Sequence, residues 1–116
     1  MPRREWRIRV GDIQEATKRA LSYVNGLEFE QFSADRRSVD AVSYAIVVIG
    51  EAAGHIPEFV MQAAPEIPWA DIRGMRNRIA HEYFGVDLRV LWETVMEDLP
   101  QLQPALRALL ERTDLP

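Results

Sequence analysis

The sequence has no cysteine and only two histidines, His55 and His81, among its 116 residues. The absence of cysteine excludes disulfides, thiolate nucleophiles and cysteine-ligated metal, and it agrees with a reducing cytoplasm. Two histidines also leave little for a histidine metal site. We therefore expect a protein that carries no bound metal and no cofactor.

Long hydrophobic runs are missing as well. The longest, Ala45 to Ile49, is far shorter than the roughly 20 residues that span a bilayer, and Met1 to Val10 has four arginines without a signal-type apolar region. We expect a cytoplasmic protein with no membrane partner. The net charge of −4 argues against a protein that holds nucleic acid through bulk electrostatics, so any contact with phosphates must be local.

The apolar residues that are present suffice for one compact core, because they make up 47% of the chain. They recur at three- and four-residue intervals, which is typical of amphipathic helices, and the short connections favour antiparallel neighbours. We expect an all-α fold, an antiparallel bundle of four to six helices in a single domain, residues 1–116. The predicted helices are Trp6 to Asn25, Ser33 or Asp35 to Ala53, Glu58 to Ala64, Trp69 to Tyr83, about Asp87 to Pro100, and Gln101 to Arg112, with a polar linker around Glu28 to Gln31.

Local signals mark several ends of these helices. Gly26 can supply a left-handed stop after the first helix, and Ser33 or Asp35 can cap the second. Pro100 is expected to break or kink the helix that contains Trp92. That helix should face the one over 69–83.

The densest group of functional side chains lies on the helix predicted from Trp69 to Tyr83. Arg76 and His81 are five residues apart, which separates them by about 140° around the helix axis and about 7.5 Å along it. One straight helix cannot bring both onto one small group. Two copies of the helix, related by a two-fold axis, could surround a shared groove with two arginines and two histidines, so we expect a two-fold homodimer.

An arginine and a histidine at one phosphate can cleave RNA without a metal. Histidine titrates near neutral pH, so it can accept the proton of a ribose 2′-hydroxyl or donate one to the leaving 5′-oxygen. Arginine can stabilise the charge on the phosphoryl oxygens in the transition state. The spacing alone is a weak signal, because Arg76 could pair with an acid and His81 could be a surface histidine.

The string from Arg76 to Tyr83 resembles the Arg-Asn-x3-His-x-Tyr signature of the HepT-like toxins, a family of the HEPN superfamily. The segments around it agree with that resemblance, which covers about Phe32 to Leu99. They are Ile49 to Ala53, Ile67 to Trp69, Val86 to Asp87, and Trp92 with Asp98 to Pro100.

The resemblance implies a dimeric, metal-independent ribonuclease toxin in which Arg76 and His81 are catalytic and Asn77 supports them. It also implies a partner, a minimal nucleotidyltransferase antitoxin that silences the toxin by transferring AMP from ATP to Tyr83, and that can assemble with the dimer into a larger hetero-oligomer. Arg73 and Arg78 are candidate RNA contacts. Two other interpretations stay open: a non-catalytic HEPN adaptor for a nucleotidyltransferase, and a plain helical dimerisation domain.

Glu51 and His55 lie near the end of the second predicted helix. An unpaired buried carboxylate would be costly, so Glu51 is expected either to meet Arg76 or Arg78 and orient it, or to be a partly exposed glutamate at a helix end. His55 follows the glycine that ends this helix and is interpreted as a cap-region residue without a catalytic role.

Overall fold

The computed structural model describes residues 2–81 and 87–116, with side chains from Trp6 to Arg76 and from Asp87 onward. This part of the chain is all-helical and contains no strand, as the periodicity predicted. Its elements are α1 (Pro2–Val24), α2 (Phe29–Ala34), α3 (Arg36–Ala53), α4 (Glu58–Ala63), α5 (Trp69–His81), α6 (Leu88–Glu93), the π-helical turn η2 (Thr94–Asp98) and α7 (Leu99–Leu110). Because α6, η2 and α7 follow one another without a break, the described residues form six helices.

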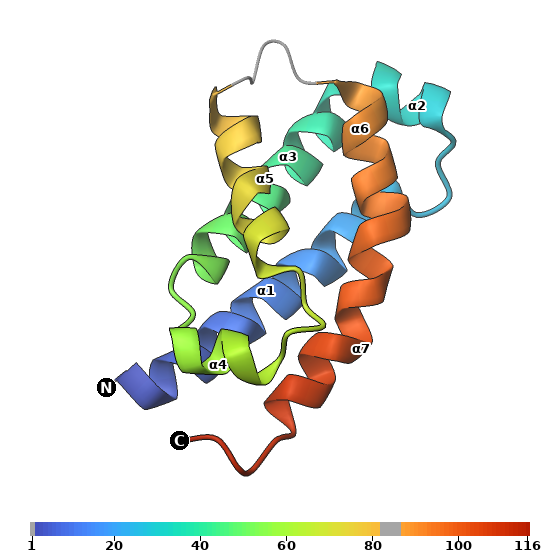
Figure 1. Cartoon of the computed structure of the whole chain (residues 1–116). Coiled ribbons are helices and arrows are strands. Elements are labelled where there is room, and N and C mark those ends of the chain that lie inside the picture. Colours follow the sequence, from blue (N-terminus) through green and yellow to red (C-terminus); the bar gives the residue numbers. More distant parts are fainter. Residues whose placement is uncertain (1, 82–86) are drawn as a thin grey trace.

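The helices form an antiparallel bundle, in which α1 and α5 run one way and α3 and the long helix α6 to α7 run the other (Figure 1). Helix α3 packs against both α1 and α5. Its inner stripe includes Val42, Ile46 and Ile49, all at most 1% exposed. This stripe of α3 therefore faces the core.

Two of the predicted helix ends are confirmed by the backbone. Gly26 has φ of +82°, the left-handed conformation that glycine adopts without a side-chain clash. The Asp35 side chain caps α3 by accepting a hydrogen bond from the Arg37 backbone N–H at 3.2 Å.

The predicted polar linker around Glu28 to Gln31 is wrong, because most of it belongs to helix α2. The Gln31 side chain accepts a hydrogen bond from the Glu28 backbone N–H at 2.8 Å, which favours a helix start there. Phe29 and Phe32 then pack on Trp92, with ring centroids 6.1 and 5.3 Å apart. Trp92 thus packs on α2, and the packing of these aromatic rings explains why a helix forms where a linker was predicted. That the helix of Trp92 also faces the one over 69–83 stays a prediction.

Pro100 does not break its helix either. The Leu99 backbone N–H donates to the carbonyl of Thr94, five residues back, so the turn before Pro100 is wider than an α-turn. A wider turn accommodates a residue that has no N–H and whose ring would clash with the carbonyl four residues earlier. The chain therefore continues as one helix through the proline.

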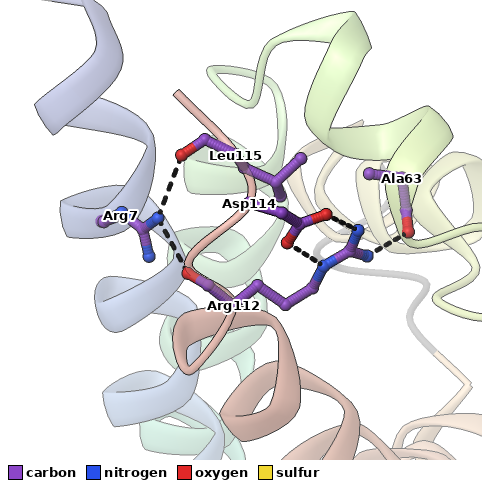
Figure 2. Close-up of polar contacts among 5 residues, drawn as sticks. All are labelled: Arg7, Ala63, Arg112, Asp114 and Leu115. Carbon is purple, nitrogen blue, oxygen red and sulfur yellow. Dashed lines mark hydrogen bonds and ion pairs between the residues drawn. The ribbon is translucent and has the colours of Figure 1, made fainter.

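The end of the chain is fastened to α1 and α4 by two arginines (Figure 2). Arg7 donates to the carbonyls of Leu110 at 3.2 Å and Arg112 at 3.0 Å. Arg112 donates to the carbonyl of Ala63 at 2.7 Å and binds Asp114 through two nitrogens at 3.0 and 2.7 Å. We call the five residues Arg7, Ala63, Leu110, Arg112 and Asp114 the tail clasp.

Among the described residues, no helix has the length and apolar content needed to cross a membrane.

Candidate active site

The site is positioned by a close crossing of α3 and α5. Gly50 of α3 lies directly against Arg76 of α5, and a Cβ atom at Gly50 would overlap the Arg76 Cβ. Glycine is needed here for the close approach and not for backbone conformation, because no positive φ is found at this position. The crossing brings the residues that follow Gly50 beside the side chain of Arg76.

Glu51 lies next to Gly50 and binds Arg76. Its Oε1 accepts a hydrogen bond from Arg76 Nη1 at 2.8 Å, while the two side chains keep 57% and 42% of their surface exposed. An ion pair this exposed adds only roughly 0–1 kcal/mol to stability. What the structure gives is therefore a contact between the Glu51 carboxylate and the Arg76 guanidinium, and not a large contribution to stability.

His55 extends this group by one turn. Its Nε2 lies 3.8 Å from Glu51 Oε2, so the Glu51 carboxylate stands between the imidazole and the guanidinium of Arg76. With Arg73, exposed and one turn before Arg76 on α5, these side chains line an open pocket of about 360 Å³. The residues that line it are Gly50, Glu51, Gly54, His55, Arg73 and Arg76.

The remaining predicted site residues are placed only in part. Helix α5 includes Asn77, Arg78 and His81, so Arg76 and His81 share one continuous helix. The side chains of Asn77, Arg78 and His81 lie outside the described part of the structure. Tyr83 lies outside the described residues altogether. The helix geometry that separates Arg76 from His81 by about 140° applies as expected.

The chemistry that the described part of the site offers is cationic hydrogen bonding. Arg73 and Arg76 each carry a planar fork of N–H donors that matches phosphate oxygens. Within the described residues, no three histidine, aspartate or glutamate side chains gather where they could hold a metal ion. The described side chains thus suit an anionic ligand.

Two residues of the site were not predicted from the sequence: Gly50 as a contact of Arg76, and His55 as a neighbour of Glu51. A signal for His55 existed, since Glu51 and His55 are four residues apart and such pairs meet on one helix face. No comparable signal existed for Gly50, because its importance depends on which residue of a distant helix lies opposite.

Comparison with known proteins agrees with this architecture. The family model for ribonuclease HepT-like proteins matches residues 13–109, so the chain belongs to this family. It is 44% identical over 92 residues to a protein of Thermococcus cleftensis named "Probable ribonuclease HepT", covering 79% of this chain and 84% of that protein.

Two further relatives are named as candidate RNases. One, from Caldanaerobacter subterraneus, is 35% identical over 79% of this chain and 82% of its own length. The other, from Methanocaldococcus jannaschii, is 31% identical over 96% of this chain and 92% of its own length. No solved structure matches the chain.

Proposed function

We propose that the protein is a metal-independent endoribonuclease and the toxin of a toxin–antitoxin pair in the cytoplasm. The observation that carries the proposal is Arg76, held by Glu51 at the mouth of an open pocket, in a chain of the ribonuclease HepT-like family. A guanidinium fixed in this way can receive a phosphodiester without first losing conformational freedom.

In the proposed reaction, the ribose 2′-oxygen attacks the adjacent phosphorus and the 5′-oxygen leaves. His81 accepts the 2′-hydroxyl proton or delivers a proton to the leaving oxygen. Arg76 stabilises the negative charge on the phosphoryl oxygens, and Asn77 supports the site. The products are a 2′,3′-cyclic phosphate and a free 5′-hydroxyl, which requires RNA because DNA lacks the attacking hydroxyl.

A homodimer completes this proposal. Arg76 and His81 lie on one helix about 140° apart, so a second copy related by a two-fold axis supplies the group that one protomer cannot aim at the same phosphate. Light scattering of the purified protein at micromolar concentration is expected to give the mass of a dimer. A monomer at that concentration would contradict the shared site.

Control of the toxin is proposed to act on Tyr83. Its phenolic oxygen would attack the α-phosphorus of ATP on a nucleotidyltransferase antitoxin, forming Tyr–AMP and releasing pyrophosphate and the phenolic proton. The added AMP places negative charge and bulk near Arg76, where RNA phosphates would bind.

The Tyr83→Phe variant should fold and escape silencing. Mass spectrometry should find AMP on the peptide that contains residue 83 in the unaltered protein only. AMP on another peptide would contradict this assignment.

The ribonuclease activity is tested by the product and by the metal requirement. Cleavage of RNA should continue in EDTA and leave a 2′,3′-cyclic phosphate, identified by mass spectrometry. Activity that EDTA abolishes and magnesium restores would contradict the mechanism. Failure of the unaltered protein to cleave any RNA, with binding to a nucleotidyltransferase retained, would favour the adaptor instead.

A further inference from the structure

The described side chains that line the pocket beside Arg76 come from α5 at and before Arg76, and from the end of α3. Arg73 precedes Arg76 on α5 by about 4.5 Å along the axis, whereas His81 follows by about 7.5 Å. His55 lies on the Arg73 side, because α3 and α5 run in opposite directions and Gly50, five residues before His55, faces Arg76. Arg73 and His55 therefore lie on the side of Arg76 opposite to the direction in which α5 continues to His81.

The pocket has its own hydrogen-bond donors. Arg73 makes no ion pair or side-chain hydrogen bond with any other residue of the described part of the chain, and it is exposed on the pocket wall. His55 keeps 53% of its side chain exposed and can donate through a ring N–H even when neutral. Two different donors thus face one space, Arg73 from α5 and His55 from the turn that follows α3.

Glu51 would repel an anion by itself, but it does not dominate the pocket. Two arginine charges stand against one carboxylate, and that carboxylate is engaged with Arg76 at 2.8 Å. Its second oxygen lies 3.8 Å from His55 Nε2. The Glu51 carboxylate consequently lies between two donors, Arg76 and His55, and the charges of the described side chains that line the pocket sum to a positive value.

We infer that the pocket lined by Gly50, Glu51, Gly54, His55, Arg73 and Arg76 is a phosphate subsite for the phosphodiester that neighbours the scissile one on a single RNA strand. The inference rests on the proposed function, since it assumes a scissile phosphate at Arg76. Each further nucleotide of a strand adds one phosphate, and Arg73 continues the row of cationic donors from Arg76 toward His55. The subsite therefore distinguishes RNA strands by whether they have a second phosphodiester and on which side of the scissile one it lies, and not by base identity.

Short substrates with a single ribonucleotide test this inference, because they are cut at one position. A dinucleotide contains only the scissile phosphodiester, and two trinucleotides add a second one on the 5′ or on the 3′ side. With the unaltered protein, one of the two trinucleotides should have a kcat/KM about tenfold above that of the dinucleotide, the gain expected for a charge-assisted hydrogen bond. Arg73→Gln and His55→Ala should each reduce this ratio several-fold.

The Arg107→Ala variant is the matched control, because it also removes one exposed arginine but from α7. It should keep the ratio, and circular dichroism should show that all three variants melt like the unaltered protein. The inference is wrong if neither trinucleotide is preferred, or if the preference survives both Arg73→Gln and His55→Ala.

Failure of the proposed function would appear differently, as an absence of cleavage of every substrate. Binding then decides, with the same oligonucleotides methylated at the 2′-oxygen and followed by NMR of the His55 ring. A second phosphodiester that tightens binding through Arg73 and His55 would support the subsite. Equal affinity for one and two phosphodiesters would overturn it.

Discussion

The molecule uses arginine in two contrasting ways at two places. In the tail clasp, Arg112 directs its N–H groups to the Ala63 carbonyl and the Asp114 carboxylate, and Arg7 donates to carbonyls near the end of α7 (Figure 2). At the candidate active site, Arg76 binds a carboxylate that is itself more than half exposed, and Arg73 binds nothing in the described part of the chain.

The residue type is the same at both places, and the difference lies in which groups accept hydrogen bonds from the guanidinium N–H donors. A guanidinium whose N–H groups are used by the protein's own carbonyls contributes to stability, because those carbonyls would otherwise lose their partners. A guanidinium that lines an open pocket and pairs with an exposed carboxylate contributes little to stability through that pair and can also bind an external anion. We therefore expect mutations in the tail clasp to lower mainly stability, and mutations of the arginines at the candidate active site to lower mainly activity.

The largest expected effect is on catalysis. Arg76→Ala should lower kcat for RNA cleavage by at least about 10²- to 10³-fold, because a donor aimed at the transition-state charge is lost. Alanine keeps the Cβ that packs against Gly50, so the helix crossing and the melting temperature should be retained. Gel-based cleavage assays and circular dichroism measure the two effects. Cleavage that survives would show that Arg76 is only a structural partner of Glu51.

The tail clasp should respond in the opposite way. Arg7→Ala should lower the free energy of unfolding by about 1–3 kcal/mol, since a charged donor to partly buried carbonyls is lost. Urea denaturation measures this. Arg9→Ala is the control, because Arg9 lies two residues further along α1 and makes no side-chain hydrogen bond in the described part of the chain. RNA cleavage per folded molecule should stay unchanged in both variants.

The Gly50 crossing links the two regions, because it is a packing feature that positions a functional side chain. Gly50→Ala should cost about 1–3 kcal/mol of stability by overpacking, and it should also reduce cleavage by displacing Arg76. Gly74 lies on α5, and a Cβ atom added there has no described atom of a neighbouring element within 4 Å, so Gly74→Ala should instead stabilise α5 by about 0.5–1 kcal/mol. Equal melting temperatures for the two variants would contradict the close crossing.

The smallest effect concerns pH. The hydrogen bond from Arg112 holds the pKa of Asp114 below its usual range. A carboxyl whose pKa is lowered by folding stabilises the fold above its unfolded pKa of about 3.9, and this contribution is lost as the pH falls through the lower folded value. Asp114→Asn should therefore lower the melting temperature at neutral pH, with the deficit shrinking below about pH 4. In an Arg112→Ala background the same change should have no pH-dependent effect.

The helices were predictable because the apolar stripes are regular and the caps are local. Asp35 and Gly26 act within a few residues of themselves, so sequence spacing suffices to find them. Helix α2 was missed because a helix of only six residues carries little periodic signal. Its formation depends on Trp92, which is sixty residues away and reaches it only in the folded bundle.

The candidate site shows the same division between local and distant information. The position of Arg76 on a helix and its separation from His81 follow from counting along the chain. The choice between Arg76 and Arg78 as a partner for Glu51 does not, because it depends on how α3 and α5 cross. The structure gives the contact with Arg76, whereas the role of Glu51 as an orienting residue stays a proposal.

The π-helical turn has a consequence for helical phase. By using five residues for a step that normally takes four, η2 shifts everything after it by about 100° around the axis, as a one-residue insertion would. The residues that follow it, Leu99, Leu102 and Leu106, are buried with that shift included. Deleting the exposed Met96 would remove the extra residue and restore ordinary α-helical pitch, so the leucine stripe should keep its orientation, but the Pro100 ring would then press against the preceding turn.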